Sequence, residues 1–142
     1  MKIVVDSNRV IAALIKDGTT REILFNRNFK FFAPEYIRDE IEKYKNEIIQ
    51  RADINNKEFE ILISLIFEYI TIVPKSEYNS FIDKLKNEIS DINDLAYFAA
   101  CLSIKADGIW THDLHFKEQE KYKIYTNIDM IRMSGKKKES SD

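Results

Sequence analysis

The chain has 142 residues, of which 44% are hydrophobic, and its 22 basic and 24 acidic residues leave a formal net charge of -2. This size and hydrophobic content predict one domain with a substantial core. The near-neutral charge excludes strong long-range attraction to nucleic acid, so any RNA contact must come from a local patch.

Several classes of protein are disfavoured by what the sequence lacks. It has 3 glycines and neither a G-x-G-x-x-G nor a G-x-x-x-x-G-K-[ST] motif, which argues against nucleotide-cofactor folds. No apolar run is long enough to span a membrane, and Asp6 stands where a signal peptide would need apolar residues. We therefore expect a cytoplasmic protein in which the single cysteine, Cys101, packs as a small hydrophobe.

The first half of the chain predicts strands that alternate with helices, because short β-branched runs are followed by apolar residues at helical spacing. The predicted elements are a strand at 2–5, a helix at 7–16, a helix capped by Thr19 or Thr20 that runs to Phe25, a strand at 30–33, and a helix from Glu35 to about Ala52 with Pro34 at its first turn. In the last helix, Ile37, Ile41, Tyr44 and Ile48 are expected on one core-facing stripe, with Glu40 at its edge.

A further helix, opened by Asn55 or Asn56 and running to Ile70, is more apolar than a one-sided surface helix should be. Either it is sandwiched within the domain or its second face contacts another subunit, in which case the chain forms a homodimer. The core face is expected to carry Phe59, Leu62, Ile63 and Ile66, while Ile61, Leu65 and Phe67 spread apolar surface over the rest.

The second half continues the alternation. The predicted elements are a strand at 71–73, a helix at 76–89, a helix capped by Ser90 or Asp91 with Leu95, Phe98, Ala99 and Leu102 inward, a strand at 108–111 that includes the core residue Trp110, a strand at 124–126, and a short helix through Met133. The whole pattern predicts an α/β fold with three α/β/α layers and a central parallel sheet. Residues 1–134 would form the domain, and the charged segment 135–142 would be a disordered tail.

Acidic residues stand where such a fold brings strand ends together, at Asp6, Glu40, Asp94 and Asp113. Carboxylates gathered at one sheet edge repel one another unless a cation lies between them, and a hard divalent ion with oxygen ligands is the usual partner. This joint placement favours a metal-dependent phosphodiesterase.

Each acid also has an ordinary structural explanation. Asp6 could cap the first helix, and Asp91 could cap a later helix with Asp94 in its first turn. Glu40 could be one glutamate of a charged helix, and Asp113 could begin a turn.

Three segments resemble the motif blocks of the PIN-domain family: DSNRVIAALI, APEYIRDEI and SDINDLAYFAACLSIKADGIWTHDLHF. The resemblance spans residues 2–128. It implies a parallel sheet flanked by helices and a metal-dependent ribonuclease activity that cuts RNA, often as the toxin of a VapC-type toxin–antitoxin pair. An antitoxin protein is then an expected partner.

The resemblance is carried over position by position. In the first two blocks, Asp6 matches the acid that ends the first strand, Asn8 matches a polar residue two places later, and Glu40 matches the acid on the helix after the Pro-containing turn. Arg9 departs from the pattern, since an apolar residue is commoner there.

In the third block, Asp91 and Asp94 match the two acids of a D-x-x-D motif. Asp113 matches the acid after the strand, and Thr111 fits a small hydroxyl position beside it.

The expected chemistry is hydrolysis of a phosphodiester with Mg²⁺ or Mn²⁺ as cofactor. Our hypothesis gives Asp6, Asp94 and Asp113 metal-holding roles, and lets Glu40 position or deprotonate the attacking water. Supporting hydrogen bonds are expected from Ser7, Asn8 and Thr111, with Asp91 as a less certain acid.

Of two other functions, a receiver domain is disfavoured and a non-catalytic scaffold stays open. A phosphoacceptor receiver domain would need adjacent acids and a later strand-end Asp and Lys, which are not found. A non-catalytic PIN-like scaffold that binds RNA or a protein would share the fold. His112 and His115 lack the helical pair of a zinc protease, so zinc is disfavoured and surface or packing roles are expected for both.

Overall fold

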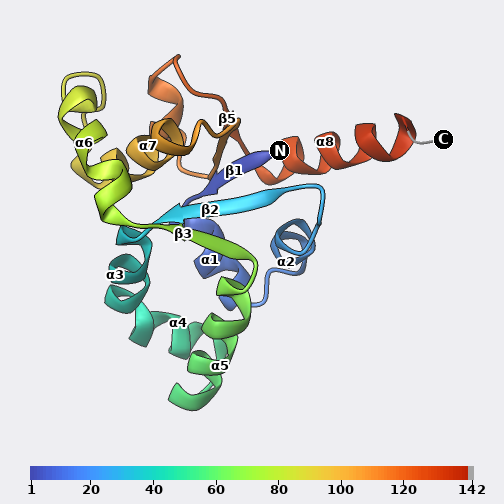
Figure 1. Ribbon diagram of the computed structural model, residues 1–142. Helices are drawn as coiled ribbons and strands as arrows, with labels where there is room; N and C mark the ends of the chain where they lie inside the picture. Colours follow the sequence, from blue (N-terminus) through green and yellow to red (C-terminus); the bar gives the residue numbers. More distant parts are fainter. Residues whose placement is uncertain (141–142) are drawn as a thin grey trace.

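The computed structural model describes residues 1–140, in which a five-stranded parallel sheet lies between two layers of helices (Figure 1). The strands are β1 (Lys2–Val5), β2 (Lys30–Pro34), β3 (Ile70–Val73), β4 (Gly108–Trp110) and β5 (Ile124–Tyr125). Their order in the sheet is β3-β2-β1-β4-β5, and every neighbouring pair is parallel. The predicted three-layer α/β/α fold with a central parallel sheet is confirmed.

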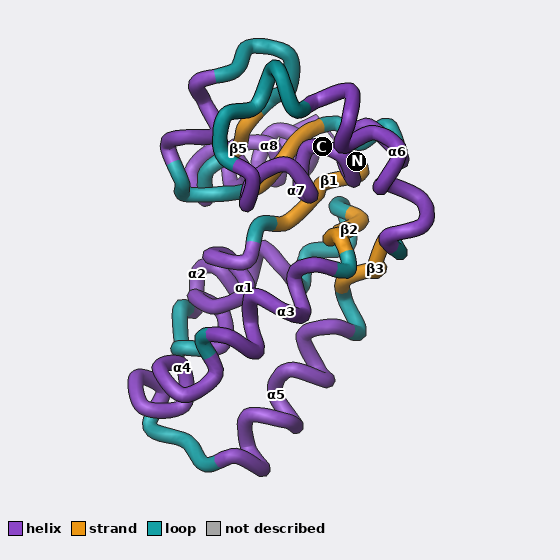
Figure 2. The backbone as a smooth tube through the Cα atoms, turned by 90° about the vertical axis from the view of Figure 1, so that its left-hand side faces the viewer, coloured by secondary structure: helices purple, strands orange, loops and turns teal. Residues whose placement is uncertain are grey.

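Helices cover both faces of the sheet. In Figure 2, α1 to α5 lie on one side of the strands, and α6 and α7 lie on the other. The last helix, α8, contacts α2 and β5. The helices are α1 (Ser7–Leu14), α2 (Gly18–Leu24), α3 (Tyr36–Lys43), α4 (Lys45–Ala52), α5 (Asn56–Phe67), α6 (Lys75–Leu85), α7 (Ile92–Ile104), α8 (Asn127–Ser140) and the 3-10 helix η1 (Leu114–Glu118).

The centre of the core is β1, whose residues Ile3, Val4 and Val5 have no exposed surface. A central parallel strand covered by helices on both faces needs apolar residues at successive positions, which explains the uninterrupted run. On α7, every residue from Asp94 to Cys101 is buried, because the helix packs on α6 and on the sheet. Trp110 and Cys101 lie in this core as predicted, and burial raises the pKa of the Cys101 thiol to about 12.

The helix expected from Glu35 to Ala52 is two helices, and the prediction of one continuous helix was wrong. Tyr44, with φ of -99° and ψ of 8°, ends α3 and precedes α4. Its side chain is 39% exposed instead of facing the core, whereas Ile41 and Ile48 are buried. Neither Pro nor Gly marks this break in the sequence. Because the break lets both α3 and α4 contact α1, we attribute it to tertiary packing.

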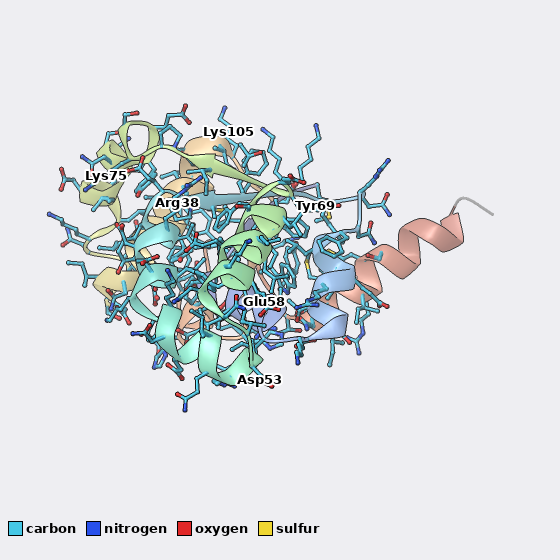
Figure 3. All side chains as sticks on the ribbon, turned by 90° about the horizontal axis from the view of Figure 1, so that it is seen from below. Arg38, Asp53, Glu58, Tyr69, Lys75 and Lys105 are labelled. Carbon is cyan, nitrogen blue, oxygen red and sulfur yellow. The ribbon has the colours of Figure 1, made fainter. Side chains whose placement is uncertain are left out.

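Several element ends also differ from expectation. Pro34 is the last residue of β2, paired with Val73, and not the first turn of the next helix. Asp17, not Thr19 or Thr20, caps α2 by accepting a hydrogen bond from the Thr20 N–H. The cap at Asn55 is as predicted and forms a capping box with Glu58, which Figure 3 shows at the start of α5.

At the end of the chain, α8 continues past Met133 to Ser140, so it is longer than the short helix expected. The expected disordered tail at 135–142 falls partly on this helix and partly on residues 141–142, which lie outside the described residues. The division into a domain at 1–134 and a tail therefore stays a prediction. Within residues 1–140, no helix has both the length and the apolar character that crossing a membrane requires.

Gly108 gives a test of the packing between β4 and β5. A Cβ added at Gly108 would overlap the Tyr125 ring and lie 2.8 Å from the Lys123 carbonyl oxygen. We expect Gly108→Ala to lower the free energy of unfolding by about 1–3 kcal/mol, measured by urea denaturation. Gly18→Ala is the control, because a Cβ there meets nothing within 4 Å. Equal midpoints for the two variants would contradict this account of the packing.

Candidate active site

The site lies where the order of the sheet reverses. From the central strand β1 the chain moves outward through β2 and β3, and then returns to the other side of β1 with β4 and β5. In parallel sheets, the carboxyl ends of the two strands at such a switch point frame the functional crevice. Here Asp6 follows β1 and Thr111 follows β4, and the Asp6 N–H donates to the Trp110 carbonyl over 3.0 Å.

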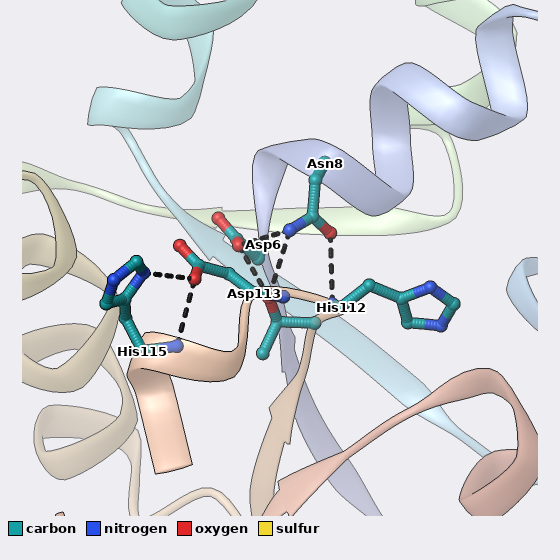
Figure 4. A network of polar contacts seen from close by, with 6 residues as sticks. Asp6, Asn8, His112, Asp113 and His115 are labelled. Atoms are coloured by element: carbon teal, nitrogen blue, oxygen red, sulfur yellow. Dashed lines mark hydrogen bonds and ion pairs between the residues drawn. The ribbon is translucent and has the colours of Figure 1, made fainter. Parts of the chain in front are cut away.

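The carboxylate of Asp6 uses its two oxygens for different purposes. Oδ1 accepts from the Ser7 N–H over 2.8 Å, which caps α1 as the ordinary explanation of this residue requires. Oδ2 accepts from Thr111 Oγ1 over 2.7 Å and from Asn8 Nδ2 over 3.0 Å. Capping therefore uses Oδ1 alone, and Oδ2 makes the contacts with Thr111 and Asn8 that Figure 4 shows.

Asp6 is only 6% exposed, and this burial is the main reason that its pKa rises to about 6. The negative charges of Glu40 and Asp113 raise the pKa further, while the hydrogen bond from Thr111 lowers it. Carboxylates from three separate segments are thus close enough to resist one another's ionisation.

Glu40 reaches the site from α3 and is half-buried. Its Oε1 accepts a short hydrogen bond from the Tyr97 hydroxyl of α7. Burial raises the pKa of Glu40, and this hydrogen bond partly offsets the rise. Burial also raises the pKa of Tyr97 well above its usual value, so the hydroxyl remains a donor. Tyr97 was missed from the sequence; its signal was a hydroxyl within the apolar run 95–102, three residues after Asp94.

The two acids of the D-x-x-D segment lie at the start of α7 in different environments. Asp91 is exposed and caps the helix, accepting from the Asn93 N–H over 2.9 Å. Asp94 is 8% exposed. Burial, and after it the charges of Asp91, Asp113 and Asp6, raise the pKa of Asp94 to about 7. Asp94 is therefore the acid of the pair that belongs to the cluster of carboxylates.

Asp113 follows β4 and begins η1. Its Oδ1 accepts from the His115 N–H over 3.0 Å and lies 2.9 Å from His115 Nδ1 (Figure 4). The hydrogen bond and charge of Asp113 raise the pKa of His115. His115 was expected only at the surface or in packing; it is exposed, but it also contacts a candidate site acid.

Thr111 and Asn8 connect the acids. The Thr111 hydroxyl oxygen, besides donating to Asp6, accepts from the Asp113 N–H over 3.0 Å and from Asn8 Nδ2 over 3.1 Å. Behind Asn8 lies a buried polar group that sequence reasoning did not find, formed by Arg9, Thr20, Trp110 and Asn127. Its members are separated by up to 118 positions along the chain, and no local pattern connects them.

The donor set suits a hard divalent cation in its chemistry. Asp6, Asp94 and Asp113 carry carboxylate oxygens, the ligand type that such a cation prefers. Burial is the main cause of the raised pKa values of Asp6 and Asp94, and the negative charges of nearby acids add to it. In their present arrangement the carboxylates do not form a metal-binding group: over residues 1–140, no three or more His, Cys, Asp or Glu side chains are placed so that they could hold a metal ion.

A comparison with protein families decides the identity of the domain. The family model described as a PIN domain matches residues 4–125, which include every acid of the cluster. The chain belongs to the PIN-domain family. Among curated proteins, none matches the sequence.

A comparison with solved structures agrees with this PIN fold. A chain from the crystal structure of VapBC2 from Rickettsia felis, bound to a DNA fragment from their promoter, matches with a TM-score of 0.64. The match covers 89% of this chain and 98% of that chain at 13% sequence identity, so it is a likeness of fold.

The coupled acids make the stability of the metal-free PIN domain depend on pH. The pKa of Asp94 is about 7 in the folded chain but about 3.9 in an unfolded one, so the folded chain binds the extra proton between these values. This contribution to stability is fully present below about pH 4 and is lost as the pH rises through about 7. We expect Asp94→Asn, in EDTA at pH 8, to raise the free energy of unfolding by about 1–3 kcal/mol.

Urea denaturation between pH 5 and pH 8 measures this effect. The control is Asp83→Asn, since Asp83 is an exposed acid of α6 that pairs with Lys86. Parallel pH profiles for wild type and Asp94→Asn would contradict the assignment of Asp94 to the coupled cluster.

Proposed function

We propose that this PIN-domain chain is a Mg²⁺- or Mn²⁺-dependent endoribonuclease. One observation carries the proposal: Asp6 and Asp94 come from separate segments of the chain, and burial, together with the charge of Asp113 and other nearby acids, raises the pKa of each. Such clustering of acids lowers the stability of the fold, and a requirement for a bound cation in the reaction would explain why the acids are there.

The charge of the site sets the order of binding. The carboxylates alone repel an anionic phosphodiester, so RNA binding at this edge requires a cation to be present first. Asp6, Asp94 and Asp113 would hold the cation, directly or through water. When bound, the ion would lower the pKa of a water molecule and neutralise charge on the phosphate oxygens.

Glu40 has a separate role in this proposal. The Tyr97 hydroxyl holds Oε1 of Glu40, which leaves Oε2 to accept a proton from the attacking water or to orient it. The raised pKa of Glu40 makes its carboxylate a stronger base. Thr111 and Asn8 would keep the carboxylate of Asp6 oriented.

We further infer that the chain is the toxin of a toxin–antitoxin pair, acting in the cytoplasm. The similarity of its fold to a chain of VapBC2 supports an antitoxin protein as partner. The single cysteine, Cys101, is buried and unpaired, which is compatible with a reducing compartment.

A second candidate is a non-catalytic PIN scaffold that binds RNA or a protein. The observation in its favour is that the described acids are not placed to hold a metal ion as they stand. Metal binding without RNA cleavage would support this alternative.

We also propose that the chain forms a homodimer through exposed apolar side chains on the outer face of α5 and just after it. Ile61, Leu65 and Tyr69 recur at a spacing of four residues and are 53%, 48% and 47% exposed. The Tyr69 ring packs on the exposed Phe25 ring, with centroids 4.6 Å apart, and Figure 3 shows Tyr69 at the end of α5 that leads into β3. These side chains extend the apolar surface that the sequence predicted for this helix.

Cleavage of RNA tests the proposed reaction. With Mg²⁺ or Mn²⁺ and a panel of structured and unstructured RNAs, we expect cutting that EDTA abolishes. Asp6→Asn, Asp94→Asn and Glu40→Gln should each lower the rate by roughly 100-fold or more, because each removes a carboxylate from the site.

Asp83→Asn is again the matched control and should cut at the wild-type rate. Cutting that persists in Asp6→Asn and Asp94→Asn would contradict the proposed site. Absence of cutting together with measurable Mn²⁺ binding would favour the scaffold.

Light scattering after size exclusion tests the dimer. At micromolar concentration we expect twice the chain mass of 16.8 kDa for wild type and a single chain mass for Leu65→Lys, since a charge would be buried at the interface. Ile92→Lys is the control, because Ile92 is 77% exposed on α7 and lies outside this face. A strictly monomeric wild type would contradict the interface.

A further inference from the structure

Arg9 is a buried cation directly behind the acid cluster. It is 8% exposed and lies on α1, where the similarity to PIN domains predicts an apolar residue. Its Nη1 donates to Thr20 Oγ1 over 3.3 Å and to Asn127 Oδ1 over 3.4 Å. Asn127 is held in turn by Trp110, whose Nε1 donates to the same oxygen over 2.9 Å. One end of the guanidinium is therefore clamped between α1, α2 and the start of α8.

The other end of the guanidinium points to the site. Arg9 Nε donates to Asn8 Oδ1 over 3.0 Å, and the His112 N–H approaches the same oxygen at 3.4 Å. On its opposite side, the Asn8 amide presents Nδ2 to Asp6 Oδ2 and to Thr111 Oγ1. Asn8 thus lies between a group that can only donate and a carboxylate that, when ionised, can only accept.

The orientation of the Asn8 amide is set by these neighbours. If the amide turned over, Nδ2 would face the Nε–H of Arg9, and Oδ1 would face the carboxylate of Asp6. A donor would then meet a donor and an acceptor would meet an acceptor. Arg9 therefore disfavours the flipped amide, because its Nε–H can only donate and could not accept a hydrogen bond from Nδ2 of Asn8.

Core packing does not account for a cation at this position. Burial lowers the pKa of Arg9, although the negative charges of Asp17 and Asp6 act to raise it. In the described part of the chain, no carboxylate lies within salt-bridge distance of the guanidinium. An apolar side chain would fill the space without this desolvation cost, but it would leave Asn8 Oδ1 only the longer contact with the His112 N–H, at 3.4 Å.

We propose that Arg9 is a positioning residue which fixes the side-chain amide of Asn8 and, through it, the cation-facing oxygen of Asp6. The inference rests on the proposed function in so far as Asp6 holds a divalent ion. Groups that orient a metal ligand from behind typically change metal affinity by about 10- to 100-fold when they are removed. Arg9 acts through one intervening side chain, so a smaller effect of roughly 3- to 10-fold is expected.

Calorimetric titration of the purified protein with Mn²⁺ alone tests this role in a double-mutant cycle. We expect Arg9→Met to weaken Mn²⁺ binding by roughly 3- to 10-fold, and Asn8→Ala by at least as much. The decisive expectation is that Arg9→Met adds nothing in the Asn8→Ala background. Arg21→Met is the matched control, because the Nε of Arg21 donates to the Ala13 carbonyl over 2.6 Å on the same side of the sheet but is not a hydrogen-bond partner of Asn8.

The outcomes separate the inference from the function on which it rests. Equal weakening by Arg9→Met in the wild-type and Asn8→Ala backgrounds, or no weakening at all, would overturn the positioning role while leaving metal binding intact. If the wild type does not bind Mn²⁺, the proposed metal dependence fails, and the inference is then decided by a measurement without metal.

That measurement is the side-chain NH₂ signal of Asn8 in a ¹⁵N-labelled sample. In wild type and Arg21→Met the two amide protons should be distinct and slow to exchange, whereas in Arg9→Met they should exchange faster and move toward each other. Arg9→Lys provides a second variant if Arg9→Met does not fold, since it keeps the charge and most of the stem but lacks the Nε–H. Unchanged Asn8 signals in the folded variants would refute the role of Arg9.

Discussion

The repulsion between carboxylates at the switch point is the constraint on which this structure depends. Asp6, Glu40, Asp94 and Asp113 come from four segments, and burial deprives each of part of the water that would screen its charge. The surrounding structure compensates locally: Ser7, Thr111 and Asn8 donate to Asp6, and Tyr97 donates to Glu40. These bonds hold the charged groups in place without neutralising them, as the proposed cation-dependent site would require before an ion binds.

Much of this arrangement could be predicted from the sequence, because its main signals are local. The apolar run before Asp6 and the periodic helices alternate in a way that only a parallel sheet satisfies, and right-handed crossovers then bring the carboxyl ends of β1 and β4 to one edge. Placing Asp6 and Asp113 together requires no knowledge of side-chain contacts. The pattern of strand ends also included Glu40 and Asp94, but an acid on a helix has many ordinary uses, and the similarity to PIN domains supported both positions.

The rest depends on contacts between distant parts of the chain. The helix break at Tyr44 follows from packing on α1, and neither Pro nor Gly marks it in the sequence. The bond between Tyr97 and Glu40 joins residues 57 positions apart, and that between Arg9 and Asn127 joins residues 118 apart. Hydrogen bonds of this kind have no periodicity, so sequence reasoning recognised Arg9 as unusual without finding its partners.

The burial of α7 has a consequence for how the site could ever be lost. Asp94 and Tyr97 lie within a stretch in which every residue from 94 to 101 is buried, and Asp6 follows the buried residues 3–5 of β1. Proteins open locally where buried contacts are few, at ends and exposed loops. Fraying of the C-terminal end of α8 or of the turn before α5 would leave Asp6 and Asp94 in place, so these two acids should keep their positions until the domain as a whole unfolds. Proteolytic cleavage at the periphery would then shorten the chain and leave these buried acids in place.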